Sequence, residues 1–364
     1  MVNPDDKSQL PQLNTLNDLI NFFTDHHNNK SYAAFNVFDM GRHIIEMSNE
    51  DFNRFEQTEI PWPTPLLQSA WFALIFSDPK NAQDHFWFLK FPLDEQGKLV
   101  QAARDEYIAQ FLQQIADKNL TIENSSKIES PYGFKPSEEK LANINAKYKV
   151  KKNLQPSNYF TPVVQYFLEA QWHNWQMLGY QGIADFCSRL NTQSNNKESI
   201  NNQTLESLLL NSFTFLPVPM ISYLSSALEH HKLSKSIYSL WIKQLDHKQL
   251  ISQINTLRVI SFNNYSKQQA HYIEQCLTGP FRSNIELLAL VSGRNWLYLK
   301  DNKLMLLYLE ALANNEDSEQ NFVILLQDLV FVPGMREHVL SQFRNPKRSD
   351  KLSQAIGHFY GMSR

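Results

Sequence analysis

The chain has 364 residues, of which 42% are hydrophobic and 20% are charged, so its composition excludes wholesale disorder and its length predicts two domains. Its 10 glycines are too few for a fold that relies on glycine-rich, phosphate-binding loops, and helices are therefore favoured. The formal net charge is −3, but residues 1–120 carry 9 Lys and Arg against 17 Asp and Glu, and this acidic part would repel a nucleic-acid backbone.

We expect neither a secretory signal nor a membrane-spanning helix in this chain. Residues 1–12 are polar and acidic, without the apolar core of a secretory signal. No apolar run approaches the roughly 20 residues that a membrane helix needs. We therefore expect a cytoplasmic protein. Cys187 and Cys276 lie far apart, without the spacing of metal ligands, and are expected to be buried free thiols.

A short amphipathic helix is predicted for residues 14–25, and four runs rich in β-branched and aromatic residues follow it. These runs cover residues 32–38, 42–47, 70–76 and 86–91. Turn signals at Asp39–Gly41 and Ser77–Asn81 predict that the runs form two hairpins. We expect Trp71 and Trp87 on the two strands of the second hairpin, with at least one of them buried.

Two further helices complete the N-terminal part. Ser48 and Asp51 have the spacing of a capping box, which predicts a helix that continues to Gln57. Residues 98–117 keep apolar side chains at helical spacing. The sequence therefore predicts an α+β domain over residues 1–120, in which a small antiparallel sheet carries helices on one face.

The composition changes after this domain. Residues 121–157 combine Ser, Asn, Glu, Pro and seven lysines with few large apolar residues, which predicts a polar, lysine-containing linker or a surface crossing. Residues 158–364 have helical periodicity in almost every window, with short breaks between about nine to eleven helices. We expect an all-helical array there, either HEAT-like or irregular, because no residue signature repeats.

Four segments stand out for their residue combinations. They are Phe38–Arg42, the Trp-containing segment Pro61–Trp71, the stretch Phe88–Gly97, and Gly182–Asp185 followed by Arg189. This combination resembles a bacterial domain-of-unknown-function family, number 3549, and its pieces span both halves of the chain. The resemblance implies a bacterial cytoplasmic protein of similar length, and it supplies no activity and no catalytic residues.

The common catalytic motifs are missing from the sequence. It contains no Gly-x-Gly-x-x-Gly, no Walker-type Gly-Lys-Ser/Thr, no Gly-x-Ser-x-Gly, no His-Glu-x-x-His and no Cys-x-x-Cys. We therefore expect no cofactor, and a non-enzymatic role is favoured. A catalytic site assembled from residues scattered along the sequence remains open.

Five polar residues are the candidates for ligand binding or interaction. Asp39 and Arg42 flank a glycine turn and could present a carboxylate and a guanidinium to a ligand, although Asp at such a turn more often bonds its own backbone. Arg104 either joins a buried ion pair or lies on a solvated helix face. Asp185 and Arg189 have i,i+4 spacing, which an ordinary intrahelical pair explains.

Histidines offer weaker candidates. His173 lies between Trp172 and Trp175, an arrangement that fits either a stacking platform or, as we favour, core packing. The pair His230-His231 follows a predicted helix end, where an imidazolium would complement the helix dipole. Metal binding by this pair is disfavoured.

The functional hypothesis follows from the architecture. A helical array with short connections forms an extended surface, and no convergent set of acid, base and nucleophile is visible. We therefore expect a protein-interaction or adaptor module whose partner is another protein, with no role for nucleic acid or membrane. The alternative is an enzyme or small-ligand binder with its site at the interface of the two domains.

Overall fold

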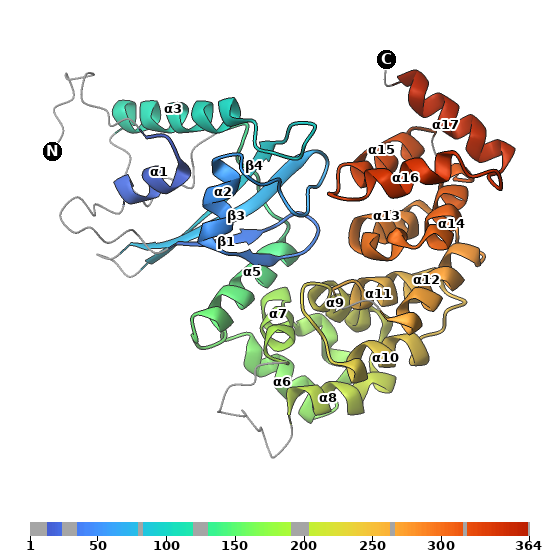
Figure 1. Cartoon of the computed structure of the whole chain (residues 1–364). Helices are drawn as coiled ribbons and strands as arrows, with labels where there is room; N and C mark the ends of the chain where they lie inside the picture. The colour runs from blue at the N-terminus through green and yellow to red at the C-terminus, as the bar shows by residue number, and fades with distance from the viewer. Residues whose placement is uncertain are drawn as a thin grey trace. The chain divides into compact units, whose positions relative to one another are not determined.

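A computed structural model describes residues 13–23, 35–78, 83–118, 130–190, 204–262, 266–315 and 319–362. The chain divides into two compact units (Figure 1). The first comprises residues 1–136 together with 331–333, and the second comprises residues 137–330 and 334–364. Within the described ranges, no helix has both the length and the apolar content needed to span a lipid bilayer.

The first unit contains a four-stranded antiparallel sheet with the strand order β2-β1-β3-β4. Its strands are β1 (Phe35–Asp39), β2 (Ile45–Met47), β3 (Ser69–Asp78) and β4 (Gln83–Pro92). Both predicted hairpins are confirmed, since β1 pairs with β2 and β3 pairs with β4. The strand β2 is shorter than predicted because residues 42–44 belong to the turn.

Three helices supply the apolar cover of one sheet face, as predicted. They are α1 (Leu16–Phe23), α2 (Asn49–Glu56) and α3 (Gln101–Lys118). The face carries alternate residues of β3 and β4, and these pack with the apolar side chains of all three helices in one core. Trp87 is buried in this core between Phe76 and Phe111, with ring centroids 4.8 and 5.1 Å away.

The hairpin register and the predicted cap are also observed. Trp71 pairs with Lys90 across the hairpin, and Trp87 pairs with Leu74, which places both tryptophans on the expected strands. The Ser48 side chain accepts a hydrogen bond from the Asp51 backbone N–H at 3.0 Å and caps α2. This bond satisfies one of the amide donors that a helix start leaves unpaired.

The second unit is all-helical in its described residues. Its elements are α5 (Glu138–Lys151), α6 (Phe160–Leu168), η2 (Trp172–Met177), α7 (Tyr180–Arg189), α8 (Leu205–Ser212), η3 (Phe213–Phe215), α9 (Val218–Leu228), α10 (Lys235–Gln244), α11 (Leu250–Ile260), α12 (Lys267–Thr278), α13 (Ile285–Arg294), η4 (Trp296–Lys300), α14 (Asn302–Ala313), α15 (Glu319–Val330), α16 (Arg336–Phe343) and α17 (Asp350–Met362). Short helices such as α8 and α16, of eight residues each, make the series longer than the nine to eleven helices expected.

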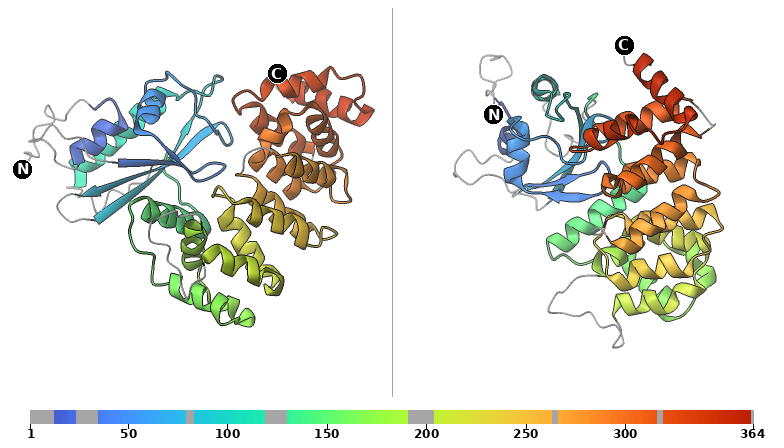
Figure 2. Two further views of the ribbon diagram at one scale, coloured as in Figure 1. Left: turned by 60° about the horizontal axis from the view of Figure 1, so that its bottom comes forward. Right: turned by 45° about the vertical axis from the view of Figure 1, so that its right-hand side comes forward.

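Alternate helices of this unit stack on one another. The odd-numbered helices from α5 to α17 pack in sequence order, each against the next, and form one row. The even-numbered helices α6, α8 and α10 pack in a second row, as do α12, α14 and α16. In the right-hand view of Figure 2, the colours of this unit change from green at α5 to red at α17 along the stack. Successive helices of one row therefore lie side by side. Their C-terminal ends can then lie close to one another, although they are far apart in the sequence.

Helix α5 occupies residues for which we expected a linker or surface crossing. It packs closely on α7, and it begins after Ser137, whose side chain accepts a hydrogen bond from the Lys140 N–H. Its buried residues are Ala142, Asn143, Ile144, Ala146 and Tyr148. Three of these five buried positions carry small or polar side chains, Ala142, Asn143 and Ala146, which explains why this segment lacks the continuous apolar stripe of a docked helix.

Candidate functional site

The glycine turn after β1 is buried and is connected by hydrogen bonds to the segment that contains Thr64 and Pro65. The carboxylate of Asp39 accepts a hydrogen bond from the Gly41 N–H at 2.7 Å and another from the Thr64 hydroxyl. Arg42 is fully buried, and its Nε donates to the Pro65 carbonyl at 2.8 Å. The preferred interpretation of Asp39, as a residue that bonds its own turn, is confirmed. Both side chains hold the turn against the proline-containing segment.

Arg104 joins the helices of the first unit. Its Nη1 donates to the Glu56 carbonyl at 2.7 Å, and Nε and Nη2 both donate to the exposed carboxylate of Asp105. The Glu56 carboxylate is itself buried and accepts from the Leu16 N–H at 2.9 Å. Burial raises the pKa of Glu56 to about 7, against smaller opposing effects of this hydrogen bond and of the Arg104 charge.

Asp185 and Arg189 form the predicted pair within α7, with 3.1 Å between Oδ1 and Nη1. The other carboxylate oxygen accepts from the Ser157 N–H at 3.0 Å, and Arg189 Nη2 donates to the Leu154 carbonyl at 3.1 Å. The pair therefore fastens the chain that precedes α6 to α7. Like the Asp39 turn and Arg104, it makes contacts that stabilise the fold, and a ligand-binding role for any of the five candidates stays a prediction.

A surface of apolar rings, which we call the aromatic patch, lies on the second unit. It is defined by two ring pairs, Trp172 with Phe215 and Trp175 with Tyr223, together with Met177 at the end of η2, the helix that contains both tryptophans. Met177 is 84% exposed and Phe215 is 62% exposed. The Trp172 and Phe215 rings stack at 6.0 Å with only 7° between their planes, and Trp175 lies 5.9 Å from Tyr223.

The patch modifies our expectation for the two tryptophans. Trp172 and Trp175 are partly buried and pack with one side on the core of the array, as favoured from the sequence. They lie in the short 3-10 helix η2, which contains no fully buried residue, so their other sides face the surface. His173 between them is exposed. Core packing therefore accounts for only one side of each tryptophan ring.

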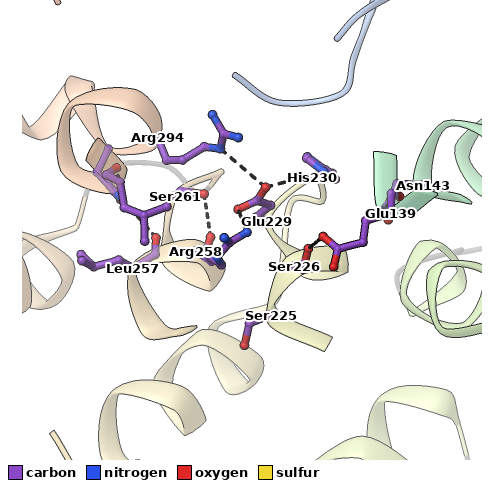
Figure 3. Close-up of polar contacts among 12 residues, drawn as sticks. Glu139, Asn143, Ser225, Ser226, Glu229, His230, Leu257, Arg258, Ser261 and Arg294 are labelled. Carbon is purple, nitrogen blue, oxygen red and sulfur yellow. Dashed lines mark hydrogen bonds and ion pairs between the residues drawn. The ribbon is translucent and has the colours of Figure 1, made fainter. Parts of the chain in front are cut away.

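A second group, which we call the Glu229 cluster, joins three helix ends of the odd-numbered row (Figure 3). Glu229 is the buried C-cap of α9, and its Oε2 lies 3.2 Å from Nη1 of Arg258 in the last turn of α11. Its Oε1 lies 3.5 Å from Nε of Arg294, in the last turn of α13, and 3.7 Å from Nε2 of His230. One carboxylate thus faces two permanently charged guanidiniums.

Burial disfavours a charge on the neighbouring His231, contrary to expectation. His231 follows α9 as predicted, but its Nε2 is buried without a hydrogen-bond partner. Burial of the ring, together with the charge of Lys147 on α5, lowers the pKa of His231 well below its ordinary value. It therefore does not complement the dipole of α9 as an imidazolium. Within the described ranges, no three His, Cys, Asp or Glu side chains gather as a metal site requires.

A small pocket lies beside the cluster, between α5, α7 and α9. Its lining residues are Glu139, Asn143, Tyr180, Ile183, Tyr223, Ser226 and Ala227. The Ser226 hydroxyl donates to the Glu139 carboxylate across it at 2.8 Å. The pocket has room for a water-sized molecule and is too small for a metabolite.

Comparison with known proteins identifies the family. The model of DUF3549, described as a protein of unknown function, matches residues 12–360. The chain belongs to the DUF3549 family. This result confirms the resemblance seen in the sequence. No curated protein and no solved structure matches the chain.

Sequence reasoning missed the Glu229 cluster of this DUF3549 chain. Its carboxylate and two guanidiniums come from three different helices, so no local spacing connects them. An Arg in the last turn of a helix is also what the helix dipole favours, which makes Arg258 and Arg294 look ordinary in the sequence. Only the stacking of α9, α11 and α13 brings the three side chains together.

Proposed function

We propose that the helical array of this DUF3549 protein is a cytoplasmic protein-interaction module and that its partner docks on the aromatic patch. The observation that carries this proposal is the exposure of Met177 and Phe215 beside the partly buried Trp172 and Trp175. Large apolar side chains that gather on a surface commonly mark a site of association. Trp, Tyr, Phe and Met are also the residues enriched at the centres of protein interfaces.

The energetics of the patch support binding of a macromolecule. Removing apolar surface from water stabilises a complex by about 25 cal/mol per Å² before the costs of association. The parallel Trp172 and Phe215 rings support each other, and Trp175 is held against Tyr223. Side chains already fixed in the free protein lose little conformational entropy when a partner covers them. The patch therefore combines exposed area with a preformed shape.

Affinity capture from the native cell tests this proposal. Met177→Asp and Phe215→Ser change exposed side chains, so we expect both variants to fold and to lose the partner recovered with the wild-type protein. Leu297→Ser is the matched control, because Leu297 is an exposed apolar residue on η4, outside the patch. An unchanged set of captured proteins with both patch variants would contradict the proposal.

A further inference from the structure

The two arginines of the Glu229 cluster use few of their donors. Arg258 donates to Glu229 through Nη1 alone. Arg294 approaches Glu229 through Nε, which is buried and makes no hydrogen bond. Neither side chain makes another hydrogen bond or ion pair with the part of the chain that the structure describes. Figure 3 shows that the terminal nitrogens of Arg294 are directed away from Glu229.

The side chains of Glu229, Arg258 and Arg294 together carry a surplus positive charge. Each guanidinium remains protonated at all ordinary pH values, so two positive charges share one carboxylate. Arg258 and Arg294 are only 28% and 17% exposed, and water therefore screens the surplus charge incompletely. Nε of Arg294 is buried without an acceptor, whereas the other unused N–H donors of the two guanidiniums reach the surface, where an acceptor from solution can approach them.

Stabilisation of the helix ends explains the cluster only in part. A cation in the last turn of α11 or α13 complements the helix dipole. That role does not require both guanidiniums to converge on one buried carboxylate, and it does not use the remaining N–H donors. Glu229 instead contacts one nitrogen of each guanidinium, through Oε2 for Arg258 and Oε1 for Arg294, and the remaining nitrogens make no hydrogen bond within the described residues.

We propose that Arg258 and Arg294 together bind a small-molecule oxyanion, a phosphate or a carboxylate group, beside Glu229. The planar fork of N–H donors on a guanidinium matches the paired oxygens of such groups. The low exposure of both side chains admits a narrow group more easily than a folded surface. The Glu229 carboxylate would repel the bound anion, but the attraction of the anion to two guanidiniums outweighs this repulsion. The guanidiniums would contact the anion directly, and Coulomb energy falls with distance. This site goes beyond the proposed docking function and does not depend on it.

Titration of the full-length protein with inorganic phosphate and, separately, with acetate tests the proposal. The measurement is the NMR signal of the arginine Nε–H groups, which reports on Arg258 and Arg294 without any substitution. We expect saturable shifts of these two signals with at least one of the anions, at a dissociation constant on the order of 1 mM for so small a probe. Phosphate and acetate affinities then decide between a phosphate and a carboxylate ligand.

Substitutions provide the second arm of the test. We expect Arg258→Gln and Arg294→Gln each to weaken the binding about tenfold, since each removes a charged hydrogen-bond donor. Arg282→Gln, at an exposed arginine outside the cluster, should leave the affinity unchanged. Failure of both anions to shift the two wild-type signals saturably would overturn the proposal, whether or not the variants fold. Unchanged affinity in both folded cluster variants would also overturn it.

Discussion

Gly182 lies so close to Tyr159 that a Cβ atom built on Gly182 would be 2.2 Å from the Tyr159 carbonyl oxygen. The same Cβ would be 2.9 Å from Cγ2 of Val163 on α6. Real Cβ atoms do not approach backbone oxygens this closely, so only glycine allows α7 to pack here. The sequence Gly182–Asp185 therefore combines a close approach with the Asp185 carboxylate that fastens the chain before α6.

Gly182→Ala should destabilise the helical array. We expect overpacking to lower the free energy of unfolding by about 3 kcal/mol and the better helix propensity of Ala to restore about 1 kcal/mol. The net decrease is then about 2 kcal/mol. Gly357→Ala on α17 is the matched control, because a Cβ at this position meets nothing within 4 Å. Thermal unfolding of both variants checks the prediction. A melting temperature of Gly182→Ala equal to or above that of the control would contradict it.

Glu56 should make the stability of the first unit depend on pH. Its pKa is about 7 in the folded protein and near the ordinary 4.5 in the unfolded chain. Between these values the folded state holds a proton that the unfolded state has released, so the free energy of unfolding falls as pH rises through this window. The expected loss is about 3 kcal/mol, complete above the folded pKa.

Glu56→Gln isolates this effect. The amide oxygen can still accept a hydrogen bond from the Leu16 N–H but does not titrate. The free energy of unfolding of the variant should therefore fall much less than that of the wild type between pH 5 and pH 8. Urea unfolding at the two pH values provides the measurement. Glu59→Gln is the control, because it changes a nearby exposed carboxylate. Its free energy of unfolding should fall with pH as that of the wild type does. The pKa assignment would be wrong if wild type and Glu56→Gln declined equally.

Glu229→Gln should weaken the junction of α9, α11 and α13. Breaking a buried ion pair commonly costs 3 to 5 kcal/mol, and the partial exposure of Arg258 and Arg294 reduces our expectation to about 2 kcal/mol. Glu274→Gln breaks the exposed pair with Lys303 and should cost less than about 1 kcal/mol. Chemical unfolding of both variants compares the two effects. Equal losses would show that the Glu229 cluster behaves as a surface pair.

Local patterns predicted the sheet well. The alternating residues of β3 and β4 and the Ser48 cap act within a few residues of chain, and sequence spacing records them directly. Helix α5 was missed because Ala142, Asn143 and Ala146 occupy three of its five buried positions. Helix propensity and close packing on α7 hold this segment, and neither produces an apolar stripe.

The candidate sites depend on contacts that sequence spacing does not record. The Asp185–Arg189 pair was predictable because its partners are one helical turn apart. The Glu229 cluster joins residues from three helices, and the aromatic patch depends on which side of η2 meets the core. Such contacts are fixed by tertiary packing, which the periodicity of a single helix does not specify.

Site-specific photo-crosslinking in the native cell tests the docking hypothesis most directly. A photoreactive residue replaces Met177 in the aromatic patch, and in a second strain it replaces Leu297 on η4. We predict that a defined protein is crosslinked at position 177, that it is absent at position 297, and that Phe215→Ser abolishes the crosslink. The absence of any crosslinked protein at position 177, or the same proteins at both positions, would contradict the account.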